Sequence, residues 1–331
     1  MHAPPILVEV TRGDAVECAH RGSIAVVDAD GRVVFATGDI DKPVYARSAI
    51  KPIQALPFVE SGAADSEEPE QIALACASHS GEKQHTERVA ACLKRLGLDH
   101  HALECGAHMP YHAPTAEAMI RAGEQPSEIH NNCSGKHTGI VATCVKCGEP
   151  VKGYMAPAHP AQRRITAVYE AMCGLDLTRA PRGIDGCGLP QIGIPLRALA
   201  LGIARLGTPD KLPPERARAC KRIAAAMIAH PSLVAGTGRF CTRAIEAAGG
   251  KAVLKTGAEG NFMGAIPGTG LGFALKIEDG AARASEITAA QVLLRFADLD
   301  AKGREAVTAL SRTPIANRAG LTVGEVRPAA W

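Results

Sequence analysis

The chain has 331 residues, of which 46% are hydrophobic and 21% charged, so it can bury a large core and is not intrinsically disordered. Aromatic residues make up only 3% and the formal net charge is +3, which argues against stacking platforms for bases and against a strong field for nucleic acids or anionic membranes. No segment has the roughly 18 consecutive apolar residues of a membrane span, and the N-terminus lacks the features of a secretion signal. We therefore expect a small-molecule partner, with no nucleic acid and no membrane.

The beginning of the chain predicts β-structure. Short runs rich in β-branched residues predict strands over 6–10, 23–27 and 33–36. The Asp28-Ala29-Asp30-Gly31 stretch between the last two has the Asp-Gly pair that is typical of a hairpin turn.

The middle of the chain changes to helical periodicity. Apolar residues recur at helical spacing over 89–96, 165–172 and 213–231, with glycines or prolines at the ends of these segments. Strand patterns return over 252–255, 261–266 and 270–277, and 287–296 is again helical. These patterns predict an α+β fold, in which a sheet built from both chain ends packs against a central helical region. We expect a single domain over 1–331, with terminal β parts at about 1–45 and 250–331 and a helical middle at about 46–249.

The eleven cysteines indicate reduced thiols. Their number is odd, they are spread along the chain and no signal peptide precedes them, which predicts a cytoplasmic location. Cys76 and Cys92 stand among alanines and leucines, as small core residues do. Cys144 and Cys147 have the C-x-x-C spacing but no second pair, so we interpret them as structural.

Ser48 and Lys51 form a Ser-x-x-Lys motif. Residues three apart on a helical turn share a face, so the hydroxyl and the amine can meet. Lysine acts as a base for serine only if burial or a neighbouring cation lowers its pKa. The spacing alone is common, and an N-cap serine beside a solvated lysine is its ordinary interpretation.

Two further motifs follow in a suggestive order. Lys255-Thr256-Gly257 ends a predicted strand, and a Ser-x-x-Lys motif followed by Lys-Thr-Gly is typical of active-serine β-lactamases and penicillin-binding proteins. Ser78-His79-Ser80 lies where those enzymes carry a second serine motif, but it is not their Ser-Asp-Asn sequence. These motifs predict an active serine.

Cys133 and Cys187 differ from the other cysteines because each lies in a polar loop beside glycines, His130–His137 and Gly183–Gly188. Thiolates and imidazoles are good Zn²⁺ ligands, which makes this region a candidate metal site. Neither a P-loop, nor H-E-x-x-H, nor a dinucleotide fingerprint is present. Arg239, after Gly236-Thr237-Gly238, is a candidate for holding a carboxylate.

Six motifs together resemble the L-asparaginase II family of the Rhizobium etli type, the class 3 asparaginases. The resemblance spans nearly the whole chain and its most specific block is Asn131–His137; the motifs are Arg47–Gln54, Cys76–Glu82, His130–His137, Gly183–Gly188, Gly236–Arg239 and Lys255–Gly260. It implies a serine β-lactamase-like fold with an antiparallel sheet, a homodimer, and hydrolysis of L-asparagine to L-aspartate and ammonia.

The resemblance also implies residue roles. It implies two Ser–Lys pairs, Ser48 with Lys51 and Ser80 with Lys255, and a Zn²⁺ held by Cys133, Lys136 and Cys187. We predict that Ser48 is the nucleophile and Lys51 its base. For the substrate, Arg47 or Arg239 would bind the α-carboxylate and Asp185 the α-ammonium group, unless Asp185 orients the metal ligands.

Other functions remain open at this point. Within the same chemistry, a glutaminase or a β-lactamase-like enzyme is the alternative, and in a different class, a non-enzymatic zinc or redox protein built around Cys133 and Cys187. Ammonia release separates the enzymes from the metal-binding protein.

Overall fold

The computed structural model describes residues 3–331, which form two compact units. The first unit comprises the N-terminal segment to Ile50, Gly193–Thr208 and Arg243–Trp331. The second comprises Lys51–Ile192 and Pro209–Thr242. Within residues 3–331, no helix has both the length and the apolar character that crossing a membrane requires.

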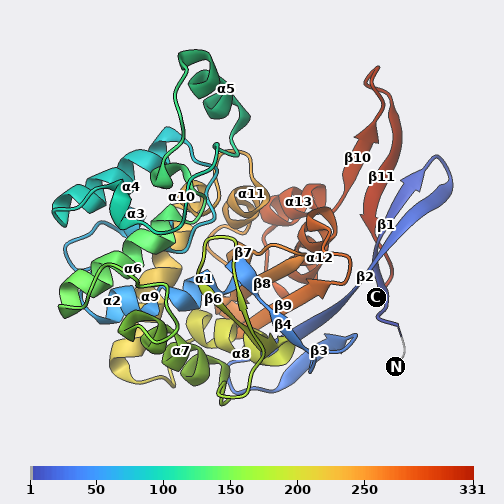
Figure 1. Cartoon of the computed structure of the whole chain (residues 1–331). Coiled ribbons are helices and arrows are strands. Elements are labelled where there is room, and N and C mark those ends of the chain that lie inside the picture. Colours follow the sequence, from blue (N-terminus) through green and yellow to red (C-terminus); the bar gives the residue numbers. More distant parts are fainter. Residues whose placement is uncertain (1–2) are drawn as a thin grey trace. The chain divides into compact units, whose positions relative to one another are not determined.

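The first unit contains an antiparallel sheet in the order β10-β11-β1-β2-β9-β8-β7, with β3 paired to β2 beside this path. The strands are β1 (Ile6–Arg12), β2 (Ala15–Asp28), β3 (Val33–Thr37), β7 (Val253–Thr256), β8 (Asn261–Ile266), β9 (Leu271–Ile277), β10 (Thr313–Ala316) and β11 (Thr322–Pro328). Strand β1, near the N-terminus, pairs with β11, near the C-terminus (Figure 1). The predicted α+β class and the sheet built from both chain ends are confirmed.

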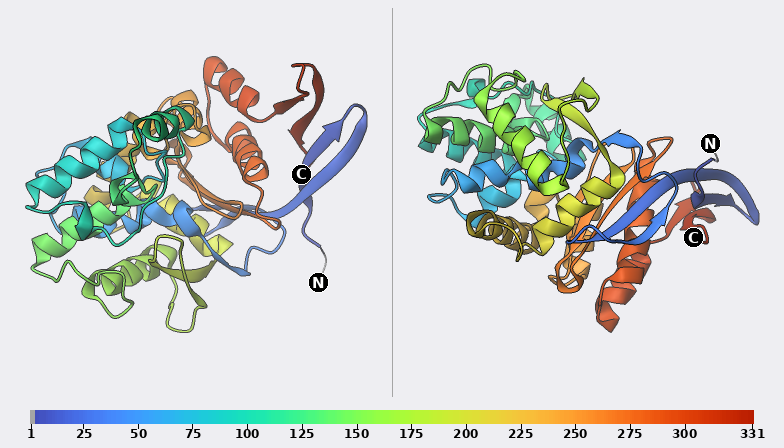
Figure 2. Two further views of the ribbon diagram at one scale, coloured as in Figure 1. Left: turned by 45° about the horizontal axis from the view of Figure 1, so that its top comes forward. Right: turned by 90° about the horizontal axis from the view of Figure 1, so that it is seen from below.

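Helices cover both faces of this sheet. α8 (Leu196–Gly207) lies on one face and α12 (Ala282–Phe296) on the other (Figure 2). A sheet covered on both sides needs apolar residues in consecutive positions rather than in alternation. All six residues of β8 are indeed buried, as is the run Ser23–Val27 of β2. α13 (Ala301–Leu310) follows α12 and precedes β10.

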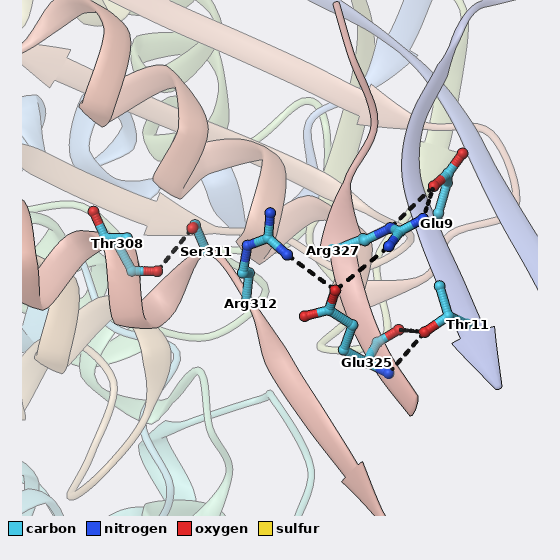
Figure 3. Close-up of polar contacts among 7 residues, drawn as sticks. All are labelled: Glu9, Thr11, Thr308, Ser311, Arg312, Glu325 and Arg327. Atoms are coloured by element: carbon cyan, nitrogen blue, oxygen red, sulfur yellow. Dashed lines mark hydrogen bonds and ion pairs between the residues drawn. The ribbon is translucent and has the colours of Figure 1, made fainter. Parts of the chain in front are cut away.

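Polar side chains tie the last strand to the first (Figure 3). Arg327 of β11 forms an ion pair with Glu9 of β1 at 3.1 Å and another with Glu325 at 3.6 Å. The backbone N–H of Glu325 donates to Thr11 Oγ1 at 3.0 Å, and Arg312 binds the Glu325 carboxylate at 2.9 Å. Exposed pairs of this kind contribute little individually to stability.

The second unit is mainly helical. Its helices are α1 (Lys51–Gln54), α2 (Leu56–Glu60), α3 (Pro69–Ala75), α4 (Lys83–Arg95), α5 (Ala113–Ala122), α6 (Ser134–Cys147), α7 (Pro160–Cys173), α9 (Pro214–Ala229) and α10 (Pro231–Val234). Helix α6 is buried continuously from Ser134 to Cys144, whereas a surface helix buries only one face. It packs against α2, α3, α4 and α7, so its N-terminal end lies inside the unit.

The remaining elements join the units along the chain. β4 (Pro43–Tyr45) pairs with the second half of β6 (Pro190–Pro195), and β5 (Arg182–Ile184) pairs with its first half. The 3₁₀ helix η1 (Arg47–Ile50) runs directly into α1, and α11 (Phe240–Ala247) follows α10.

The predicted segments are confirmed, with ends that differ by up to eight residues, but the prediction was incomplete in the middle and at the C-terminal end. The segment 196–207 is helical, yet it packs on the sheet of the first unit as α8. β10 and β11 were not predicted, because most of their residues are only partly buried and their sequences carry no apolar alternation. That residues 1–331 form a single domain stays a prediction.

Candidate active site

Lys51 is a buried amine in the second unit. Its side chain is 1% exposed, and Nζ donates hydrogen bonds to Ala77 O at 2.6 Å and to Ser78 Oγ at 2.9 Å. A third contact, 3.2 Å long, joins Nζ to Cys133 Sγ. Burial lowers the pKa of Lys51, repulsion from Lys136 lowers it further, and attraction to Cys133 only partly opposes this. Lys51 thus meets the condition that a lysine base requires.

The three predicted metal ligands lie together. Lys136 Nζ is 2.9 Å from Cys187 Sγ, and the thiols of Cys133 and Cys187 are hydrogen-bonded to each other. All three side chains are buried. Cys133 is the N-cap of α6 and Lys136 lies in its first turn, so the start of this helix brings two of them together.

The protons in this cluster are distributed unequally. The hydrogen bond from Cys187 lowers the pKa of Cys133 well below its usual range, helped by the positive charges of Lys136 and Lys51, against the effect of burial. The same hydrogen bond and burial raise the pKa of Cys187. Burial alone would lower the pKa of Lys136, but attraction to the two cysteines raises it. These effects favour loss of the proton from Cys133 over loss from Cys187, and they favour the protonated form of Lys136.

This donor set fits a metal ion. Two sulfur atoms and one amine nitrogen converge, and thiolate and nitrogen are ligands that Zn²⁺ prefers. Binding would require the loss of protons from Cys187 and Lys136, since a metal takes only deprotonated ligands.

Ser80 makes a contact that sequence reasoning missed. Its Oγ donates to Glu82 Oε1 at 2.5 Å. The Glu82 carboxylate also accepts from the backbone N–H of Thr237 at 2.8 Å, from Thr237 Oγ1 at 2.6 Å and from Gln84 Nε2 at 3.1 Å. Burial would raise the pKa of Glu82, but these hydrogen bonds prevail and lower it to about 2. Glu82 is the last residue of the Ser-His-Ser-Gly-Glu motif, and its place in this motif is the sequence feature that could have indicated its role.

Gly236 must be a glycine because of this contact. A Cβ atom at position 236 would lie 1.9 Å from Ser80 Oγ and 2.7 Å from Glu82 Oε1, and its φ of +129° is itself unfavourable for other residues. The Gly-Thr-Gly turn therefore closes over Ser80, and Thr237 supplies two of the hydrogen bonds to Glu82.

A buried histidine holds the loop between Ser78 and Ser80. The Gly81 N–H donates to His79 Nδ1 at 3.1 Å, which leaves the proton on Nε2, 2.8 Å from Ser134 Oγ. Burial, then repulsion from His85, lowers the pKa of His79 well below its usual value, so the ring is neutral. It links the Ser80 loop to the first residue of α6.

In the first unit, the Lys-Thr-Gly motif packs on the segment that carries Ser48. A Cβ atom at Gly257 would lie 2.6 Å from Ala46 O and 3.0 Å from Ala49 N, so only glycine allows this approach. Lys255 is 1% exposed and Nζ donates to Thr256 O at 2.7 Å. The two motifs, separated by about 200 residues of sequence, are therefore neighbours.

Arg47, beside Ser48, has a strained backbone. Its φ is +52°, a left-handed conformation that non-glycine residues rarely adopt outside special sites. Arg47 borders a cavity of about 300 Å³. Its lining carries both positive and negative side chains, namely Lys42, Lys276, Glu259 and Glu278. A cavity with both signs of charge suits a zwitterionic ligand.

The other two predicted substrate residues belong to the second unit. Asp185 accepts hydrogen bonds from Gly186 N at 2.8 Å and Gln191 Nε2 at 3.2 Å, and its charge contributes to the raised pKa of Lys136. Asp185 therefore lies near the proposed metal ligands, as the sequence suggested. Arg239 is half-buried and follows the turn that covers Ser80.

Comparisons with curated sequences and with solved structures give only remote similarities. A comparison with curated protein sequences gives no significant match. Among solved structures, the chain is similar to a β-lactamase from Mycobacterium bovis (13% identity, TM-score 0.43, 83% of this chain and 94% of that chain). It is also similar to a D-alanine carboxypeptidase from Burkholderia cenocepacia (11%, 0.39, 87% and 92%) and to a simvastatin synthase from Aspergillus terreus (9%, 0.37, 87% and 90%). Because these TM-scores are below 0.5, the β-lactamase-like topology stays a prediction.

The family comparison covers nearly the whole chain. The model of the L-asparaginase II family matches residues 8–328, a range that includes all six motifs and extends over both structural units. The chain belongs to the L-asparaginase II family.

Proposed function

We propose that the chain hydrolyses the side-chain amide of L-asparagine, giving L-aspartate and ammonia. Family membership supports amide hydrolysis, and the substrate and mechanism are our proposal. The observation that carries it is the buried Lys51, whose pKa is lowered and which follows Ser48 by three residues. A serine and a lysine with a lowered pKa, three residues apart, are the residue types that acyl transfer by a Ser–Lys pair requires.

In the proposed reaction, Lys51 accepts the proton of Ser48 Oγ while this oxygen attacks the amide carbon. The tetrahedral intermediate collapses, the C–N bond breaks, and the nitrogen leaves as ammonia after taking up the proton. Water then hydrolyses the resulting ester, which releases aspartate and restores Ser48. Each turnover thus consumes one water molecule and produces one ammonia.

Ser80 is the weaker candidate for the nucleophile. Its proton is directed to Glu82, and a carboxylate with a pKa of about 2 is a poor base for a hydroxyl. We propose that Ser80, together with Lys255, binds the substrate or transfers a proton, while Glu82 fixes the direction of the Ser80 hydroxyl.

Substrate recognition is proposed to use charges at both ends of the amino acid. Arg47, which borders the mixed-charge cavity, would bind the α-carboxylate, with Arg239 as the alternative. Asp185 would bind the α-ammonium group.

We propose Zn²⁺ as the bound metal, held by Cys133, Lys136 and Cys187. When bound, it would polarise a carbonyl oxygen or a water molecule. The convergence of the three donor atoms supports this assignment. The same cluster favours the second candidate function, a non-enzymatic zinc or redox protein.

One assay tests the proposed function. Ammonia release is measured with asparagine and glutamine side by side, together with nitrocefin hydrolysis, on wild type, Ser48→Ala and the control Ser61→Ala. We expect asparagine to be the best substrate, and Ser48→Ala to reduce its kcat by roughly 10³-fold or more while Ser61→Ala does not. Near-normal activity of Ser48→Ala would transfer the role to Ser80. Metal binding without ammonia release would favour the non-enzymatic protein.

We also propose a cytoplasmic homodimer. All eleven cysteines are free thiols, which suits a reducing compartment. The dimer rests on the family resemblance, and light scattering on the purified chain tests it.

A further inference from the structure

Two histidines and a glutamate form a cluster in the second unit, separate from the residues proposed above. His100 and His101 belong to the 3₁₀ helix η2 (His100–Ala102), and Glu128 begins the 3₁₀ helix η3 (Glu128–His130). His100 Nδ1 is 2.7 Å from Glu128 Oε2, and the rings of the two histidines are 4.1 Å apart between centroids. One ligand atom from each of the three side chains lies within 4.8 Å of the others.

We propose that His100, His101 and Glu128 form a second metal site, which takes a transition-metal dication of the Zn²⁺ class. Two imidazoles and one carboxylate are a common protein donor set for such ions, with water at the open position. Mg²⁺ and Ca²⁺ prefer oxygen ligands, so the two imidazoles disfavour them.

The local structure prepares these side chains for a metal. Asp99 Oδ1 accepts from the backbone N–H of His101 at 2.9 Å and thereby holds the turn that presents both rings. The metal would replace the proton shared by His100 Nδ1 and Glu128 Oε2. Bonds of about 2.0–2.2 Å require the three ligand atoms to come somewhat closer than 4.8 Å. His101 is exposed, so its side chain can rotate to achieve this.

The site is connected to the loop that leads to Cys133. The backbone N–H of Asn131 donates to Glu128 O at 3.1 Å, and Asn131 Oδ1 accepts from the Cys133 N–H at 2.8 Å. A metal on Glu128 would therefore hold the beginning of this loop and stabilise the second unit, because a ligand that binds only the folded state raises its stability.

Cobalt titration of the metal-stripped, tag-free full chain tests this proposal. Co²⁺ bound to thiolates gives a strong sulfur-to-cobalt charge-transfer band, whereas Co²⁺ on histidine and carboxylate gives only weak visible bands. The cysteine site and the His–His–Glu site are thus measured separately, and failure of one assignment is distinguishable from failure of the other. The variants are His101→Ala and Glu128→Gln, with Glu117→Gln, an exposed carboxylate outside the cluster, as control.

We expect wild type and Glu117→Gln to bind one Co²⁺ without charge transfer and to gain thermal stability from it. His101→Ala and Glu128→Gln should bind that ion at least roughly tenfold more weakly, with unchanged far-UV circular dichroism. Paramagnetic broadening of the His100 and His101 imidazole resonances in the wild-type chain gives the same information without a variant. The proposal is wrong if wild type binds no such ion, if both variants bind it as tightly, or if these resonances are not broadened.

Discussion

The Ser80 hydroxyl donates its proton to Glu82 Oε1 over 2.5 Å, and Gly236 leaves the space in which the two side chains meet. Ser80 thus differs from Ser48, which stands three residues before a lysine whose pKa is lowered by burial. This contact distinguishes the two serines of the proposed site, because it directs the Ser80 proton to a weak base.

The stability of the chain should depend on the ionisation of Glu82. Its pKa is about 2 in the folded state and 4.5 ordinarily, so the stabilisation is complete above pH 4.5 and is lost as the pH falls through about 2. Allowing for partial solvent exposure, we expect a contribution of about 2 kcal/mol. Urea unfolding of wild type and Glu82→Gln between pH 3 and 7 measures it. Parallel pH profiles for the two proteins would contradict this assignment.

Activity should rise with pH as Lys51 loses its proton. A base must be neutral to accept the proton of Ser48, and burial lowers the Lys51 pKa from 10.5, so the rise in kcat/KM should be centred below that value. Lys51→Arg, which stays protonated, should lose activity at every pH, whereas Lys83→Arg, on an exposed helix face, should not. A pH–rate profile that Lys51→Arg merely shifts would argue against Lys51 as the base.

Gly236→Ala and Gly238→Ala form a matched pair. Both positions have a positive φ, but a Cβ atom at 238 meets nothing within 4 Å, whereas one at 236 collides with Ser80. Both variants should lose about 1 kcal/mol of stability from backbone strain. Only Gly236→Ala should lose activity by more than about tenfold, since it also displaces Ser80 and Glu82. Equal kinetics for the two variants would show that the Ser80 position is unimportant for the reaction.

Metal analysis should find one thiolate-bound Zn²⁺ per chain. Cys133→Ser and Cys187→Ser should each remove it, whereas Cys18→Ser, at an exposed cysteine, should retain it. Because Cys187 and Lys136 must lose protons, the affinity should increase with pH. Full metal content in the double Cys133→Ser/Cys187→Ser variant would refute the site.

Asp185→Asn separates substrate binding from metal orientation. If Asp185 binds the α-ammonium group, the KM for asparagine should rise far more than that for succinamate, which lacks this group. Equal losses on both substrates, together with a reduced zinc content, would show instead that Asp185 orients the metal ligands. This alternative is consistent with the effect of the Asp185 charge on the pKa of Lys136.

Local patterns in the sequence were sufficient to predict most strands of the large sheet, but among the helices only α4, α7, α9 and α12. Strand β8 was predicted over 261–266, which are its bounds in the structure. This was possible because a continuous apolar run indicates a strand that is buried on both faces. Edge strand β10 could not be predicted, because three of its four residues are exposed and impose no apolar pattern. Cys133 and Cys187 stood out in the sequence because each lies in a polar loop beside glycines, whereas Lys136 was added to them only by the family resemblance.

Contacts between distant segments were decided only by the tertiary structure. Nothing in the sequence shows that the Lys51 amine meets Cys133, or that Glu82 accepts from Thr237, because these partners are separated by 82 and 155 positions. The ionisation of each group depends on such neighbours and on burial, which a one-dimensional pattern does not contain. The sequence by itself thus determined which residues could react, and packing around α6 and the Gly236 turn decided which side chains meet and in which direction their pKa values shift.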